Sequence, residues 1–180
     1  MVKIKIHRGA REIGGSCVEI AADEHRIILD LGLPLQDAGE EKPDWKTQTG
    51  PRVSEMPLPD IEGLYGGQVP SVEGVVLSHA HQDHSGLLNS VHQSIPVYMS
   101  RESELLLDTG NIFHVFEQEE RGTPGRRVLF KHWRPFEIGP FRITSFLMDH
   151  SAFGSSAFLI EKGGKRVHCV CGSPPIQQQD

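Results

Sequence analysis

A short run of metal-binding residue types follows an apolar segment in the middle of the chain, and it constrains the fold more than any other feature. Residues 75–78 read as a buried strand, and His79, His81, Asp83 and His84 follow directly. Side chains two positions apart in an extended segment point to the same side, so His79 and His81 can face one ion. Asp83 and His84, where the chain turns into a helix, can face a second ion nearby. The pattern predicts a metal centre at the end of a buried strand.

The donor types limit which metals fit. Neutral imidazole binds zinc at about 2.0–2.1 Å, and a set that includes a carboxylate also suits manganese or iron. A third imidazole is needed to complete the first site, and His150 is the natural candidate because it ends an expected strand. Asp149 would point the opposite way along an extended chain, so we assign it no ligand role. Asp30, at another strand end, could accept the second ring proton of a ligand histidine, or it could simply cap a turn.

Hydrophobic periodicity predicts a mixed α/β chain with strands at both ends and helices between them. Expected strands cover residues 2–6, 17–21, 26–31, 75–78, 96–99, 128–131, 134–138, 141–148, 157–161 and 165–170. One helix is expected over 83–93, with Leu87, Leu88 and Val91 on one face. Ser100 is expected to cap a second helix. The apolar residues that keep helical spacing after this cap are Leu105, Ile112, Phe113 and Phe116. Residues 32–71 are rich in Pro, Gly, Asp and Glu, and we expect a long loop there with one short helical turn.

Composition narrows the class of protein. The 180 residues suffice for one domain of ordinary size. A formal net charge of -6 argues against a dedicated polyanion-binding module, although a local basic groove remains compatible with it. No stretch of about 18 apolar residues occurs, and residues 1–15 lack the apolar core of a signal peptide, so we expect no membrane segment. Three cysteines are too few for a disulfide framework, which favours the reduced cytoplasm.

These motifs resemble those of the metallo-beta-lactamase superfamily. The similarity consists of Asp30 within Leu29–Gly32, the His79–His84 motif and the later His150. Further segments resemble the ribonuclease J and beta-CASP branch, which cuts RNA. They are Arg11–Cys17, Leu31–Pro34 and Asp149–Phe153, and the resemblance covers roughly residues 1–168.

The resemblance implies a four-layer αββα sandwich with a dinuclear site, usually zinc, along the strand ends. It assigns His79, His81 and His150 to one metal, and Asp83 and His84 to the other. Water activated in such a site attacks a phosphoryl or carbonyl centre, so hydrolysis needs no side-chain nucleophile. Asp83 would be the catalytic residue, because it orients the attacking hydroxide and can accept its proton.

The chain departs from the family pattern after His150. Family members carry a further Asp that bridges both metals at the end of the returning strand, and Cys169–Gly172 stands there instead. We therefore expect residues 1–171 to form the N-terminal part of the domain, incomplete at its C-terminus, and residues 172–180 to be a disordered tail. Without the bridging Asp, at most one metal should be held tightly.

Three explanations of this departure remain open. The chain could be a truncated or frame-altered product of a longer enzyme. It could be a divergent enzyme in which the Cys171 thiolate, a good zinc ligand at about 2.3 Å, replaces the Asp. It could also be a half-protein completed by a homologous subunit.

Three functions follow from the resemblance. The first is a metal-dependent phosphodiesterase that processes RNA, and the second is a hydrolase of a small thioester, lactone or amide. The third is a non-catalytic metal-binding remnant or an interaction partner of an intact homologue. The local basic cluster consists of Arg121, Arg126, Arg127, Lys131 and Arg134. Acidic Glu117, Glu119 and Glu120 oppose it, which favours a solvated face over an RNA groove.

Overall fold

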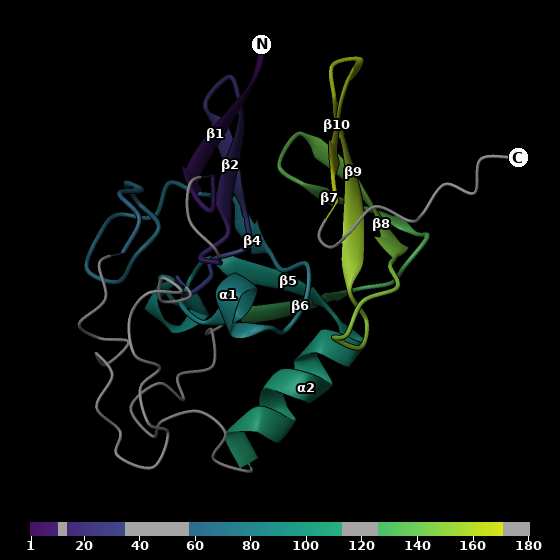
Figure 1. Cartoon of the computed structure of the whole chain (residues 1–180). Helices are drawn as coiled ribbons and strands as arrows, with labels where there is room; N and C mark the ends of the chain where they lie inside the picture. Colours follow the sequence, from purple (N-terminus) through teal and green to yellow (C-terminus); the bar gives the residue numbers. More distant parts are fainter. Residues whose placement is uncertain (11–13, 35–57, 113–125, 171–180) are drawn as a thin grey trace, which may run out of the picture.

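Two β-sheets pack face to face in the computed structural model, which describes residues 1–10, 14–34, 58–112 and 126–170 (Figure 1). The first sheet has six strands in the order of the sequence: β1 (Val2–Arg8), β2 (Cys17–Ala22), β3 (His25–Leu29), β4 (Gly74–Val76), β5 (Pro96–Ser100) and β6 (Arg126–Phe130). The second sheet has four strands in the order β10-β9-β8-β7: β7 (Pro135–Ile138), β8 (Phe141–Leu147), β9 (Ser156–Lys162) and β10 (Lys165–Cys169).

Strand direction places the candidate site at one edge of the first sheet. β1, β2 and β3 pair antiparallel, whereas β3, β4, β5 and β6 run parallel. Parallel strands bring their carboxyl ends to the same edge, and Leu29 of β3 lies beside Val76 of β4. Asp30 and the segment that leads to His79 therefore leave the sheet side by side.

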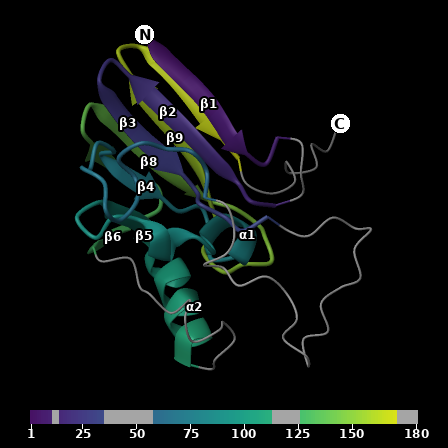
Figure 2. The same ribbon diagram turned by 90° about the vertical axis from the view of Figure 1, so that its left-hand side faces the viewer.

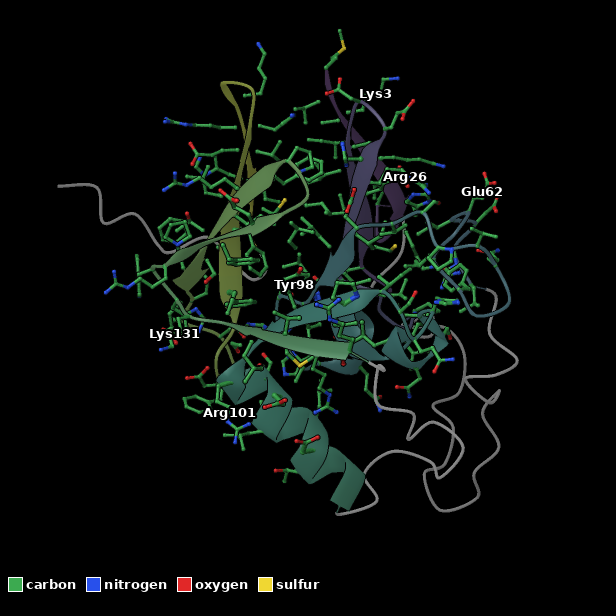
Figure 3. All side chains as sticks on the ribbon, turned by 180° about the vertical axis from the view of Figure 1, so that it is seen from behind. Lys3, Arg26, Glu62, Tyr98, Arg101 and Lys131 are labelled. Carbon is green, nitrogen blue, oxygen red and sulfur yellow. The ribbon has the colours of Figure 1, made fainter. Side chains whose placement is uncertain are left out.

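Strand β3 is buried on both faces, as its apolar run predicts. Ile27 and Leu29 pack between the two sheets with Phe141, whereas Ile28 faces the opposite way with Leu31. Figure 2 views the sheets face-on, with β1, β2 and β3 in front of β8 and β9. In Figure 3, Tyr98 of β5 lies near the middle of the molecule, where it packs against the inter-sheet cluster.

The helix expected over 83–93 is shorter than predicted. It consists of α1 (Gln82–Ser85) and a separate 3-10 turn, η2 (Leu88–Ser90). The Leu87 N–H, which would continue the helix, donates instead to the Leu31 carbonyl at 2.9 Å. The Asp83 carbonyl, its helical acceptor, receives the Ser16 N–H at 2.9 Å. Hydrogen bonds to distant segments thus replace the helical ones.

The second expected helix is α2 (Arg101–Ile112), and Ser100 caps it through a 3.1 Å hydrogen bond from the Ser103 N–H to its Oγ. The predicted apolar face of this helix is wrong at Leu105, because this side chain is 45% exposed. Leu107 packs against the core instead. Phe113, Phe116 and the expected tail over 172–180 lie outside the described residues, as does most of the expected long loop. None of the helices in the described ranges is long and apolar enough to cross a membrane.

The expected α/β class with two facing sheets is confirmed. The described helices lie with the first sheet, and within the described residues no helix covers the outer face of the second sheet. The hairpin predicted at Gly163 and Gly164 joins β9 to β10 in antiparallel register.

Candidate metal centre

Three imidazoles from two distant segments converge at the edge of the first sheet. His79 Nε2 lies 3.1 Å from His81 Nδ1 and 3.2 Å from His150 Nε2. One nitrogen from each ring lies within 4.8 Å of the other two. Imidazole nitrogens bound tetrahedrally at about 2.0–2.1 Å lie about 3.3 Å apart, so these separations suit a single small cation.

Asp30 holds the backbone and side chains behind these rings. The residue is 3% exposed and adopts a left-handed conformation with φ +58°, which aims its carboxylate at the segment after β4. Its Oδ1 accepts the Ser78 N–H at 2.7 Å, and its Oδ2 accepts the Ser78 hydroxyl at 2.8 Å. The same Oδ2 lies 2.7 Å from His84 Nδ1, so Asp30 accepts a ring proton from His84.

Ser78 connects Asp30 to His79 and determines which ring nitrogen of His79 is free. Ser78 Oγ also lies 2.9 Å from His79 Nδ1. The hydroxyl has one proton, and an ionised carboxylate can only accept it, so the Ser78 proton is directed to Asp30. His79 Nδ1 must then donate to Ser78 Oγ. This arrangement leaves a lone pair on His79 Nε2, the atom that faces the other two rings.

Burial and mutual repulsion favour the neutral form of His79 and His81 by lowering the pKa of each ring. Desolvation, with the charges that His84 and His150 would carry, lowers the pKa of His79 from 6.5 to about 4. Burial and the neighbouring His150 also lower the pKa of His81. Metal binding requires the neutral imidazole, so this environment prepares the rings as ligands.

The pKa of His84 is shifted in the opposite direction. Burial alone would lower its pKa, but the hydrogen bond and charge of Asp30, together with the charge of Asp83, outweigh burial and raise it. His84 Nε2 lies 3.5 Å from Asp83 Oδ2, so these two side chains face each other beside the three rings. They could contribute to a second cation position, but the described residues bring no third donor into that group.

Close packing of the Leu31–Leu33 segment determines where Asp83 and His84 lie. The Leu31 N–H donates to the His84 carbonyl at 2.8 Å, and the Leu33 N–H donates to the Gln82 carbonyl at 2.9 Å. A Cβ atom on Gly32 would lie 1.7 Å from the Asp83 carbonyl oxygen. Only glycine allows this approach, which accounts for the glycine within the Leu31–Pro34 run.

A cavity of about 470 Å³ opens beside this group. It is lined by polar Asp30, Ser78 and His84 on one side and by Phe158 and Cys169 on the other. Burial, with the charge of Asp30, raises the pKa of the Cys169 thiol to about 11. Cys171, the suggested substitute ligand, lies outside the described residues, so its role stays a prediction.

The structure thus brings His79, His81 and His150 together and places His84, Asp83 and Asp30 around them. Sequence reasoning missed Ser78, although a hydroxyl residue directly before the first histidine was a signal that could have indicated it. It also missed the role of Gly32, because that role depends on contact with Asp83, which is 51 residues away in sequence.

Comparison with known proteins agrees with this geometry. A family model described as the beta-lactamase superfamily domain matches residues 44–179. The RNase J-like protein of Methanocaldococcus jannaschii is 27% identical over 93% of this chain and 35% of its own length. Ribonuclease TTHA0252 of Thermus thermophilus is 25% identical over 95% of this chain and 37% of its own length. The chain therefore spans about a third of the length of these two curated relatives.

Solved structures show the same fold. A protein of unknown function from Enterococcus faecalis superimposes with a TM-score of 0.74 at 23% identity, over 93% of this chain and 42% of the other. The metallo-beta-lactamase fold protein YhfI from Bacillus subtilis gives 0.57 at 17% identity, over 93% and 61%. With the histidine cluster at the strand ends and a family match over most of its length, the chain belongs to the metallo-beta-lactamase superfamily and resembles ribonuclease J.

Proposed function

We propose that this chain is a metal-dependent hydrolase of the nuclease type, which cleaves phosphodiester bonds in RNA. The observation that carries the proposal is the convergence of three imidazoles, with a free lone pair on His79 Nε2, beside the Asp83 carboxylate. The RNA substrate is supported by relatives whose names are Ribonuclease J, RNase J-like protein and Ribonuclease TTHA0252.

The donor set fits a divalent cation. His79, His81 and His150 would hold it, and the nitrogen separations of 3.1 and 3.2 Å agree with one small ion. Zinc is the ion we propose, and manganese or iron also suits imidazole with a nearby carboxylate. A divalent ion held there supplies Lewis acidity, which polarises a phosphoryl oxygen and lowers the pKa of water.

The remaining polar residues orient the rings and the Asp83 carboxylate, or accept a proton. Asp83 has a side chain that is 26% exposed, so its carboxylate can reach a substrate and accept the proton of an attacking water. Asp30 and Ser78 keep Nε2 of His79 unprotonated by occupying the other side of its ring. His84 is held by Asp30 with its Nε2 toward Asp83, which directs this carboxylate.

Charge favours a limited contact with RNA. Arg127 lies 2.8 Å from Asp108 and 3.7 Å from Glu104, so its charge is already compensated. Among the described members of the basic cluster, Arg126, Lys131 and Arg134 are exposed. These side chains could contact phosphates, and binding that depends on them should weaken as salt rises.

The experiment compares cleavage of an end-labelled single-stranded RNA by the parent protein and by His150→Ala, after chelation and reconstitution with Zn²⁺ or Mn²⁺. Asp149→Asn is the matched control, because Asp149 is exposed beside His150. We expect metal-dependent cleavage that falls steeply with salt, survives Asp149→Asn and is lost in His150→Ala. Turnover of a neutral thioester or lactone, insensitive to salt, would instead support the small-molecule hydrolase. Bound metal without hydrolysis of either substrate would contradict the enzymatic proposal and leave a metal-binding protein.

A further inference from the structure

His150 is the one member of the histidine cluster that comes from the second sheet. It lies in the loop of residues 148–155 between β8 and β9, 71 residues from His79. Its ring is therefore placed by whatever anchors this loop, and not by the segment after β4 that carries His79 and His81. Figure 1 shows the yellow-green loop before β9 lying against the upper end of α2.

The base of the loop is closed by hydrogen bonds of the backbone and of one serine hydroxyl. The Met148 N–H donates to the Ser155 carbonyl at 2.8 Å, and Ser155 Oγ donates to the Ala152 carbonyl at 2.7 Å. The Ser156 N–H donates to the Ser78 carbonyl at 3.0 Å, beside His79. These bonds attach the stem of the loop to the histidine-bearing segment. The Gly154 carbonyl, next to this stem, accepts the Ser156 hydroxyl at 3.4 Å.

A buried hydroxyl from outside the loop also holds Gly154. Ser100 Oγ, 1% exposed, donates to the Gly154 carbonyl at 3.1 Å and accepts the Ser103 N–H at 3.1 Å. Because the carbonyl can only accept, the one proton of Ser100 is committed to Gly154. The Ser103 hydroxyl, 3.0 Å away, then acts as a donor to Ser100. The residue that caps α2 thus also anchors the loop that carries His150.

Gly154 permits this approach. It has φ +78°, and a Cβ atom there would lie 2.2 Å from Cβ of Glu102 in the first turn of α2. Any side chain at position 154 would have to push the loop away from α2. The loop and the helix are therefore in direct contact at the position where Ser100 makes its hydrogen bond.

We propose that Ser100 and Gly154 are positioning residues that fix the His150 ring against His79 by clamping the 148–155 loop to the start of α2. Neither residue reaches the histidine cluster itself. The inference rests on the proposed metal centre, because the function of the clamp is to present the third imidazole. Substitution of residues that orient metal ligands without binding the metal typically changes metal affinity by about 10- to 100-fold.

The test uses two independent substitutions, each with a matched control. Ser100→Ala removes the clamp, whereas Ser103→Ala removes a buried serine of the same network and leaves the Ser100–Gly154 bond in place. Gly154→Ala displaces the loop by placing a Cβ atom 2.2 Å from Cβ of Glu102 and 2.9 Å from Ser100 Oγ, but it leaves the Ser100 side chain in the protein. Gly164→Ala introduces a side chain at a similar φ of +74°, where nothing lies within 4 Å. If Ser100→Ala fails to fold, the glycine pair still tests the clamp.

Two readouts separate this inference from the proposed function. In the metal-free protein, the nuclear Overhauser effect between the His79 and His150 rings reports their proximity directly. In the reconstituted protein, Co²⁺ titration followed by visible absorption reports affinity. We expect Ser100→Ala and Gly154→Ala to lose the ring contact and to bind Co²⁺ at least about tenfold more weakly, and both controls to match the parent.

The outcomes decide between the two ideas. If either clamp variant folds, keeps the ring contact and binds Co²⁺ as the parent does, the positioning role is overturned. If the controls weaken Co²⁺ binding as much as the clamp variants do, the effect is general destabilisation and the inference also fails. A parent that binds no Co²⁺, while the ring contact still depends on Ser100 and Gly154, would refute the metal centre and leave the clamp standing.

Discussion

The carboxylate of Asp30 lies 2.7 Å from Nδ1 of His84 and also accepts both the N–H and the hydroxyl of Ser78. Its 3% exposure means that no solvent can replace these partners. Asp30 therefore couples the end of β3 to Ser78, which precedes His79, and to His84 in α1. Removal of this charge should disturb stability and metal binding together.

We expect Asp30→Asn to lower the free energy of unfolding by about 2 kcal/mol, because hydrogen bonds to a buried charge are worth about 1.5–3 kcal/mol and the amide places a donor where only acceptors fit. Urea denaturation of the metal-free protein measures the change. Asp23→Asn is the control, since the side chain of Asp23 is 64% exposed and forms an ion pair with the N-terminus at 3.5 Å. Equal effects of the two substitutions would argue against a structural role for the Asp30 network.

One metal ion should bind tightly and a second only weakly. Three imidazoles converge on one position, whereas the described residues offer only Asp83 and His84 at the neighbouring one. Competition titration with a chromogenic chelator and measurement of bound zinc should give about one tight ion per chain. Two ions of equal affinity would show that a donor from outside the described residues completes the second position.

Asp83→Asn should separate catalysis from metal retention. The substitution removes the proton acceptor but none of the three converging imidazoles, so RNA cleavage should fall by about 100-fold or more while the tight ion stays. Asp149→Asn, at an exposed position beside His150, should change neither RNA cleavage nor retention of the tight ion. Loss of the tight ion in Asp83→Asn would make this carboxylate a ligand of the first ion instead of a proton acceptor.

Acid should destabilise the metal-free protein through His79. Its pKa is about 4 when folded and near 6.5 when unfolded, so between these values the unfolded state binds more protons. The free energy of unfolding should therefore fall as pH drops from about 6.5 towards 4. His84 contributes with the opposite sign, because its pKa is raised, and comparison of the parent with His79→Asn isolates the His79 part. Parallel pH curves for the two proteins would contradict the assignment.

The contact between the sheets should dominate stability. Phe141 on β8 is fully buried against Ile27 and Leu29 of β3, so Phe141→Ala should lower the free energy of unfolding by about 3–5 kcal/mol. Phe153→Ala, at a residue that is 66% exposed, should change it little. Thermal or urea unfolding of both variants measures the difference, and similar losses would mean that the inter-sheet cluster is not the main core.

Much of this architecture was predictable because it depends on short segments of sequence. Alternation in residues 2–6 and the apolar run at 26–31 correctly indicated β1 and β3, and Gly163–Gly164 correctly indicated the last hairpin. Ser100 was recognised as a helix cap from its place before α2. Likewise His79 and His81 share a face because they are two positions apart, which any extended strand would produce.

Other features depend on residues that are distant in sequence. The helix expected over 83–93 ends early because Leu31 and Ser16 take its hydrogen bonds, and neither residue is near it in the chain. The second function of Ser100, as a clamp on Gly154, cannot be recognised from its role as a cap, because the two residues are 54 positions apart.

The amino-acid sequence by itself determined the donor types, their spacing and the strands that carry them, since these follow from local backbone geometry and side-chain chemistry. Tertiary structure alone decided which donors meet. The distance from His150 to His79 depends on how two sheets pack, and the pairing of Asp30 with His84 spans 54 residues. Local preferences cannot specify such contacts, because the free energy that maintains them comes from burial and hydrogen bonds shared by the whole fold.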